Sequence, residues 1–479
     1  MNRIKQLSKD SLIYGIGGAV GKGISFFLLP IYTRIFSPSD YGNIEMLSII
    51  VSLLSAFLVM GLDSAQSFYF FEQKVYGKVS QKSLVSSILQ WRLTWGLIVV
   101  LIAGTLSPLI NNWFFGGTLP LIYFGVSFFG ALFSTILNQS VQILRLLYRP
   151  WSYIGITVIN TILSAGLILL FVLVFKKGIL SFFLGSAISS LCLTFLGWYL
   201  VREYLDFTLL QSNWWPRLLK FGAPLLPAEI AFYFMSTADR WFIKYYHGQS
   251  ALGFYSVAAK FALLLAFTIE MFRMAWWPIA MDAMHSDDGP KTFRMIGRLY
   301  IGLGVAAVVY LTFLSPWLVR LLTGPAFHQS YSLIGIMSWQ SLFYGFYLIG
   351  SAGIWKVEKT YITSILMGFA ALLNILLNIL LVPTYGGMGA AIATSVTYFI
   401  WIIVSLFVSE HYWKINFPIF LMLGQIILGA ISVAAITWIH MNFVQIFILS
   451  HFIALILIIS AFEPVTIRQI IHKIKSHVG

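Results

Sequence analysis

The sequence has few charged residues and a single cysteine. Asp, Glu, Lys and Arg make up 10% of its 479 residues, where a water-soluble domain has about 25%. Cys192 lies in an apolar run, so an intrachain disulfide and a cysteine-based metal site are both excluded. The eight histidines have no metal-ligand spacing. We therefore expect no metal, no cofactor and no catalytic residue.

Hydrophobic residues dominate the composition. They make up 59% of the chain, which indicates an all-α polytopic membrane protein. Short polar stretches separate the apolar segments, and none is long enough for a separate soluble domain. About fourteen transmembrane helices are predicted, at 11–35, 44–71, 84–107, 118–145, 152–175, 179–200, 218–246, 251–281, 294–318, 329–355, 361–382, 386–409, 418–440 and 444–463.

Acidic residues are scarce relative to basic ones. There are 16 Asp and Glu against 30 Lys and Arg, which gives a net charge of +14. Most of the basic residues fall on one side when the N-terminus is placed in the cytoplasm, so both termini are predicted to be cytoplasmic. Membrane topology explains this charge, and nucleic-acid binding is not expected.

A weak internal repeat divides the chain. Tyr14-Gly15 and Phe221-Gly222 open two segments 207 residues apart, although such pairs also recur by chance. Because six helices separate the copies, a parallel repeat is expected, with two pseudo-symmetric six-helix lobes around a central cleft. The predicted parts are an N-terminal lobe (1–205), a cytoplasmic interfacial linker (206–220), a C-terminal lobe (221–412), and two extra helices with a basic tail (413–479).

Charged residues inside the predicted spans are the first site candidates. Lys22 lies about 16 Å into the first segment, near the bilayer midplane. The repeat places Glu229 opposite it, and Lys260 lies at a similar depth. Because intramembrane charges are costly, such residues mark cavities or ligand sites more often than packing. Two lysines and one glutamate favour an anionic substrate.

A second charged group lies nearer the ends of the spans. Glu270 and Arg273 can pair within one helix, while Asp63 needs another partner, and we predict that Asp63 meets Arg273 when an inner gate closes. An ordinary pair at a helix end is the alternative. Asp239 and Arg240 fit anchors at the membrane interface.

Amides and aromatic rings form weaker candidates. The fourth segment has Asn138, Gln142 and Arg145 on one face, and the tenth has Trp339 and Tyr344. Such groups can contact sugars, but packing in the protein core is the more common role of residues like these. Asn374 and Asn378 fit a bridge between helices.

Several motifs resemble one known family. They are Pro-Ile-Tyr-Thr-Arg at 30–34, Ser-Pro-Ser-Asp-Tyr-Gly at 37–42, Gly-Leu-Asp-Ser-Ala at 61–65 and Phe-Tyr-Phe-Phe-Glu at 68–72. The chain resembles Wzx-type oligosaccharide flippases of the multidrug/oligosaccharidyl-lipid/polysaccharide exporter superfamily, which act in O-antigen and exopolysaccharide synthesis. This chain differs from the family pattern at Ser67, where related chains commonly have arginine.

The resemblance implies a function. An undecaprenyl-pyrophosphate-linked oligosaccharide would cross a bacterial inner membrane from the cytoplasmic to the outer leaflet, by alternating access coupled to H+ or Na+. Polysaccharide polymerase and chain-length proteins would be further partners, besides membrane lipids. Lys22, Lys260 and Arg273 would bind the pyrophosphate, and Glu229, Asp63 and Glu270 would serve coupling and gating.

Two other functions are compatible with the composition. A cation-coupled drug exporter of the same superfamily would have a more acidic and apolar cavity. A membrane polymerase or glycosyltransferase would need a large outer loop with catalytic residues, and the stretch at 107–118 has no charge at all.

Overall fold

The structure is a computed structural model, and it describes residues 23–24, 26, 28–206, 214–284, 286–357, 359, 361–439 and 443–462. These residues are almost entirely helical, and none of them is in a strand. Lys22 and most of the predicted first segment lie outside the described residues. The end of that segment forms α2 (Leu29–Ile35).

The predicted all-α polytopic membrane fold is confirmed. In the described part of the chain, eleven helical segments are long and apolar enough to cross a membrane. Two of them, Ser236–Arg273 and Tyr361–Tyr412, break at a single glycine, at Gly248 and at Gly386. Each break has a positive φ, which glycine adopts without the steric cost of a Cβ, and it turns one long segment into two helices. The breaks fall within five residues of the predicted segment boundaries.

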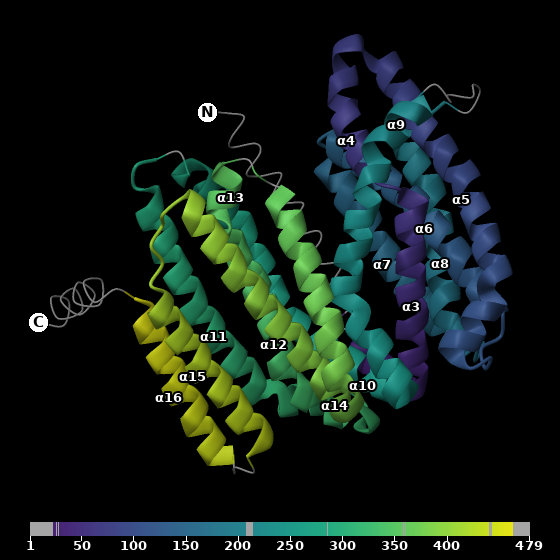
Figure 1. The fold of residues 1–479 in the computed structure, drawn as a ribbon. Coiled ribbons are helices and arrows are strands. Elements are labelled where there is room, and N and C mark those ends of the chain that lie inside the picture. Colours follow the sequence, from purple (N-terminus) through teal and green to yellow (C-terminus); the bar gives the residue numbers. More distant parts are fainter. Residues whose placement is uncertain are drawn as a thin grey trace, which may run out of the picture. The chain divides into compact units, whose positions relative to one another are not determined.

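The first compact unit ends at Thr237 (Figure 1). Its helices before the linker are α3 (Pro38–Val59), α4 (Leu62–Gln73), η1 (Lys74–Tyr76), α5 (Lys78–Phe115), α6 (Ile122–Leu146), α7 (Pro150–Leu173), α8 (Leu180–Val201) and η2 (Arg202–Tyr204). They are followed by α9 (Trp215–Gly222), η4 (Ala223–Leu225) and the start of α10 (Leu226–Ala283). Helix α6 is central, because α3, α5 and α8 all pack against it.

Local sequence explains the start of α3. The side chain of Ser37 accepts a hydrogen bond from the Asp40 backbone, and Asp40 accepts one from the Ser37 backbone. Pro38 occupies the first helical turn, where a missing N–H costs nothing. The Ser-Pro-Ser-Asp motif is thus a capping box that fixes where α3 begins.

The second unit runs from Ala238. After α10 it contains α11 (Gly289–Leu322), η5 (Pro325–Ser330), α12 (Tyr331–Gly350), α13 (Ala352–Lys356), α14 (Tyr361–Tyr412), α15 (Ile419–Trp438) and α16 (Phe443–Ala461). Helix α12 packs between α11 and α14, and α15 and α16 pack on α11. Residues 226–237 of α10 belong to the first unit, where the Tyr233 hydroxyl donates to the Ile49 carbonyl of α3 (2.6 Å). The predicted lobe boundary at 221 stays a prediction.

Two arginines of α11 hold the last two helices. Arg294 donates to the Ile415 carbonyl, just before α15, from Nε (3.0 Å) and Nη2 (2.8 Å). One turn later, Arg298 donates to the carbonyls of Ser460 and Phe462 at the end of α16. The Ser460 carbonyl lies in the last turn of α16, where a helix leaves acceptors unpaired, and the Ile415 carbonyl lies in the loop between α14 and α15. The arginines thus supply donors to both places.

Replacing Arg298 by alanine should loosen the end of α16. Charge-assisted hydrogen bonds contribute about 1.5–3 kcal/mol, so faster amide hydrogen exchange is expected over residues 455–462. Arg320→Ala, at the exposed end of the same helix, is the control and should leave this exchange unchanged. Equal exchange in Arg298→Ala and the unmodified protein would contradict the capping role.

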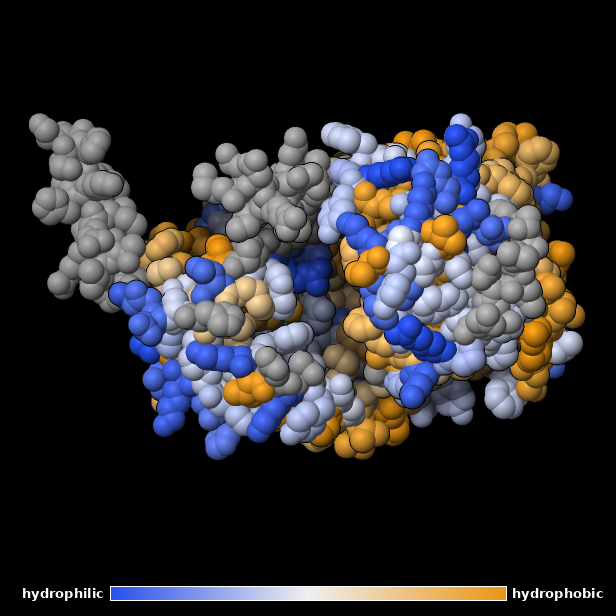
Figure 2. All heavy atoms as spheres, turned by 90° about the horizontal axis from the view of Figure 1, so that it is seen from above, coloured by the Kyte–Doolittle hydropathy of each residue, from blue (hydrophilic) through white to orange (hydrophobic). Residues whose placement is uncertain are grey.

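The surface of each unit separates polar from apolar residues. Large apolar side chains are exposed along the helices, among them Leu101, Ile162, Leu372 and Phe452. Figure 2 looks onto the helix ends, where hydrophilic residues gather. Apolar sides with polar ends are what a bilayer requires of a membrane-spanning bundle.

Candidate functional site

Asp63 forms a buried ion pair in the first unit. Its Oδ1 accepts a hydrogen bond from Nη2 of Arg92 on α5 (2.5 Å). The Arg92 side chain is 0% exposed and that of Asp63 is 31% exposed. Arg92 also donates from Nη1 to the Thr135 carbonyl of α6. One guanidinium therefore joins α4, α5 and α6, and one side of the carboxylate stays accessible.

A second carboxylate lies near this pair. Glu229, in the first turn of α10, is exposed and lies within electrostatic range of Asp63. Its predicted partner, Lys22, lies outside the described residues. The role of Glu229 as a proton carrier therefore stays a prediction.

The linker helix α9 packs against α4 and α5. The indole N–H groups of Trp214 and Trp215 donate to Ser83 Oγ (3.2 Å) and to the Ser87 carbonyl (3.1 Å) of α5. Arg217 donates to both oxygens of Glu72 on α4, and this hydrogen bonding raises the pKa of the guanidinium above its ordinary value. The position of α9 in the membrane interface stays a prediction. Its contacts with α4 and α5 are direct hydrogen bonds.

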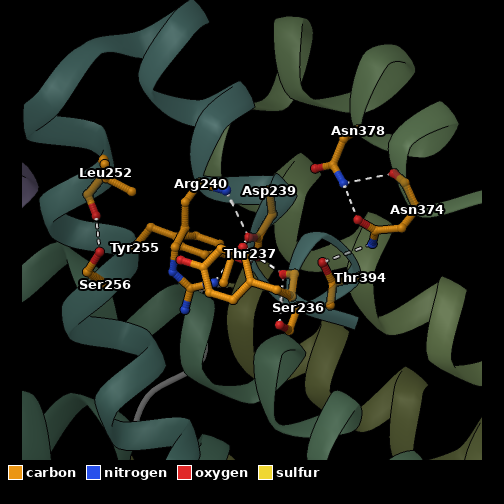
Figure 3. A network of polar contacts seen from close by, with 11 residues as sticks. Ser236, Thr237, Asp239, Arg240, Leu252, Tyr255, Ser256, Asn374, Asn378 and Thr394 are labelled. Carbon is orange, nitrogen blue, oxygen red and sulfur yellow. Dashed lines mark hydrogen bonds and ion pairs between the residues drawn. The ribbon is translucent and has the colours of Figure 1, made fainter. Parts of the chain in front are cut away.

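The second unit contains a buried polar network (Figure 3). Asp239 is 3% exposed, and its Oδ1 accepts from the backbone N–H (2.8 Å) and Nη1 (3.1 Å) of Arg240. Its Oδ2 accepts from the Tyr255 hydroxyl. The arginine therefore balances the carboxylate charge within the network. The expectation that Asp239 anchors the protein at the membrane interface is wrong, because its carboxylate is enclosed by protein donors.

Two asparagines of α14 lie in the same network. Asn374 donates to the hydroxyls of Thr394 and Thr397 (3.4 Å each), across the break at Gly386. Asn378 donates to the backbone carbonyl (2.8 Å) and the side-chain oxygen (3.0 Å) of Asn374. The predicted helix bridge is confirmed. Within the described ranges no three His, Cys, Asp or Glu residues are grouped as a metal site requires.

Removing the Tyr255 hydroxyl should destabilise this network. Tyr255→Phe leaves Asp239 Oδ2 buried without its donor, which costs about 1–3 kcal/mol of unfolding free energy. Tyr300→Phe is a matched control, because that hydroxyl donates to a neutral carbonyl, that of Leu342. Thermal unfolding in detergent should show the larger loss for Tyr255→Phe. Equal melting temperatures would mean that Asp239 finds another donor.

The predicted cations of the second unit differ in their surroundings. Arg273 pairs with Glu270 one turn away, as the spacing predicted. Lys260 is exposed on α10 and has no ion-pair partner in the described parts of the chain. Asp63 and Arg273 thus each have a partner within their own unit. The gating pair between them stays a prediction.

The predicted sugar contacts fall in both units. Asn138 and Arg145 are exposed on α6, and Gln142 is half-buried. In the second unit, Trp339 is buried and stacks on Phe343 (5.5 Å between ring centroids), while Tyr344 is half-buried. All five stay predictions as sugar contacts.

Comparison with known families decides the chain's membership. The family model described as "Polysaccharide biosynthesis protein" matches residues 7–284. The chain belongs to this family. The model named MatE matches residues 224–380. The resemblance to the multidrug/oligosaccharidyl-lipid/polysaccharide exporter superfamily, which the motifs predicted, is thus confirmed.

Similar proteins agree with this membership. A protein of the Lsg locus of Haemophilus influenzae is 25% identical over 289 residues, which cover 58% of this chain and 66% of that relative, so the match spans just under two thirds of the relative. The solved structure of "Lipid II flippase MurJ, inward closed conformation" has a TM-score of 0.71 at 20% identity and covers 93% of this chain and 98% of its own. An inward-facing multidrug resistance MATE family transporter has a TM-score of 0.65 at 14% identity and covers 90% and 100%. These two solved structures share the fold of this chain.

The sequence prediction missed some polar residues of this family member. They are Arg92, which lies within the predicted span at 84–107, and Gln66, which lies within the predicted span at 44–71. An arginine inside an apolar stretch of α5 and a glutamine one turn from Asp63 were the available signals. Neither reveals its partner, because partners on other helices depend on the packing.

Proposed function

We propose that this transporter moves an undecaprenyl-pyrophosphate-linked oligosaccharide from the cytoplasmic to the outer leaflet of a bacterial inner membrane. Alternating access coupled to H+ or Na+ would drive it, with both termini cytoplasmic. The match to the polysaccharide biosynthesis family over residues 7–284 is the observation that carries the proposal. Polymerase and chain-length proteins would act on the delivered product.

The surroundings of Lys260 support an anionic substrate. An exposed ammonium on a membrane-spanning helix is costly unless water or an anion faces it. A pyrophosphate offers the charge that such a group lacks. Lys22 and Arg273 would bind the same group, and Glu229, Asp63 and Glu270 would serve coupling and gating.

The lipid tail needs an apolar surface. A crevice in the second unit is lined only by apolar side chains, which come from α11, α12, α14 and α15. Ile301, Phe343, Leu406 and Met422 are among them. A polyisoprenoid tail that lies against this crevice would contact only hydrocarbon. The amides and rings at Asn138, Gln142, Arg145 and Tyr344 would contact the sugars.

Flipping can be measured in vesicles with a purified lipid-linked oligosaccharide and an impermeant reagent that modifies the sugar in the outer leaflet only. Lys260→Ala should slow flipping by about tenfold, the effect of one lost charge-assisted contact. Lys260→Arg should retain most of the rate, and Lys291→Ala, at the exposed start of α11, should retain all of it. Unchanged flipping in Lys260→Ala would overturn the role of this lysine, and no flipping by the unmodified protein would overturn the function.

Drug export is the second candidate, favoured by the MatE match at residues 224–380. A drug exporter of this kind moves organic cations, so the same vesicles loaded with a fluorescent cation distinguish the two. Gradient-driven cation export without oligosaccharide flipping would support drug export.

A further inference from the structure

The inner face of α4 has a row of polar side chains. Asp63, Gln66 and Gln73 lie three and seven residues apart, so they share one face of the helix with Phe70. Gln66 is 0% exposed, and neither its amide oxygen nor its amide nitrogen has a hydrogen-bond partner among the described residues. In a membrane protein such a side chain is expensive to bury without a partner.

Two further polar atoms at this interface are also unpaired. Arg92 Nε has no partner in the described part of the chain, and neither has Oε1 of Gln139, which is 2% exposed. Gln139 donates through Nε2 to the Val85 carbonyl of α5 (3.0 Å). Buried groups from α4, α5 and α6 thus offer both donors and acceptors.

Hydrogen bonds between the helices place these atoms in one layer. Arg92 lies level with Asp63, and Gln81 Nε2 donates to the Phe70 carbonyl (3.0 Å), so α4 and α5 run antiparallel. Gln66 lies between Asp63 and Phe70 on α4. Val85, which binds Gln139, lies between Gln81 and Arg92 on α5. The two glutamines therefore both fall between the levels of Arg92 and Gln81.

The row continues to the end of the α4–α5 hairpin. Gln73 accepts a hydrogen bond from Ser80 (2.5 Å), next to the exposed Lys74 and Lys78. Asp63 and Gln73 are ten residues apart, about 15 Å along the helix. Buried amides of this kind are ordinarily satisfied by ordered water. Water held by non-titrating amides can pass a proton along hydrogen bonds without binding it permanently.

We propose that the polar layer between α4, α5 and α6 binds water and forms a proton path that ends at Asp63. The proposal rests on the proposed transport function, for which it names a proton as the coupling ion and Asp63 as its carrier. The proton moves between water and an Asp63 oxygen, while Arg92 keeps its charge throughout. Gln66 and Gln139 are positioning residues, because they hold the water and not the substrate.

The charged groups that face Asp63 come from two helices. Arg92 of α5 binds one oxygen of Asp63, and the Glu229 carboxylate of α10 lies within electrostatic range of it. Helix α6 contributes the neutral Thr135 carbonyl, and α9 places the Gly222 backbone against Gly61. One cation and one acid therefore surround Asp63 in the described part of the chain.

The test is the rate at which Asp63 takes up a proton in the full-length protein in lipid vesicles. Infrared spectroscopy after an acid pH jump follows the carboxylic-acid band, which is assigned by its loss in the double variant Asp63→Leu/Arg92→Leu. Gln66→Leu should slow the rise of this band by about tenfold, because a relay step loses its hydrogen bond. Gln139→Leu should slow it as well.

A matched control comes from the second unit. Gln425 is a buried glutamine of α15 that donates to Ser460 (2.8 Å), and Gln425→Leu should leave the rate unchanged. An unchanged rate in both Gln66→Leu and Gln139→Leu would overturn the proposal, since the proton would then arrive from the exposed side of Asp63. Equal slowing in all three variants would also overturn it.

Oligosaccharide flipping in the same vesicles separates this proposal from the proposed function. Slowed protonation in Gln66→Leu without any flipping by the unmodified protein would support the path and reject the substrate. Flipping that proceeds at the same rate with and without a pH gradient would overturn the coupling role of Asp63, whatever the infrared result.

Discussion

Replacing Asp63 by leucine should lower the free energy of unfolding by about 3–5 kcal/mol, the cost of leaving a buried charge without its partner. Arg92 would keep its charge at 0% exposure and retain only the Thr135 carbonyl. Arg92→Leu should cost less, because Asp63 is 31% exposed and water can hydrate its carboxylate. Reversible unfolding in a detergent titration would measure both.

The double variant Asp63→Leu/Arg92→Leu provides the internal check. Replacing both partners by apolar residues is often close to neutral, so it should be more stable than Asp63→Leu alone. A double variant that is as unstable as the sum of the single variants would show that the two residues act independently. The ion pair would then have no energetic role.

Replacing Gly61 by alanine should cost about 3 kcal/mol, from a left-handed backbone and a steric overlap together. Gly61 has φ +68° and directly precedes α4. A Cβ there would lie 2.4 Å from the Gly222 carbonyl oxygen, at the end of α9. Since backbone atoms cannot rotate away, α9 would have to shift.

Gly116→Ala separates the two contributions. Gly116 has φ +61°, and an added Cβ would meet nothing within 4 Å. It should therefore show the backbone cost alone, about 1–2 kcal/mol. Hydrogen exchange over residues 214–222 should rise in Gly61→Ala and not in Gly116→Ala. Equal stability losses in the two variants would mean that the close approach to Gly222 has no energetic consequence.

Hydropathy predicted the helices of the described residues well. Apolar length alone located the spans after the first segment, since a bilayer imposes it. The break at Met60 and Gly61 was missed, because both sides of it are apolar and continue one predicted segment at 44–71. Its reason is tertiary: α9 packs its backbone against this point.

The polar sites were harder to predict. Depth along a helix correctly singled out Asp63 as a charged residue that needs a partner, but periodicity could not identify Arg92. Asp239 was placed in the interface because it lies near the end of a predicted span. Its burial depends on Tyr255, which comes from beyond the turn at Gly248. Such contacts follow from packing between elements, which no local pattern encodes.

The two arginines of α11 hold α15 and α16 only through main-chain oxygens. Recognition of this kind sets no requirement on which side chains stand at 415, 460 and 462. The terminal hairpin can therefore diverge in sequence, to suit a different lipid or neighbouring protein, while Arg294 and Arg298 keep it attached. These contacts would then restrict substitutions at Arg294 and Arg298 of α11 more than substitutions in α15 and α16.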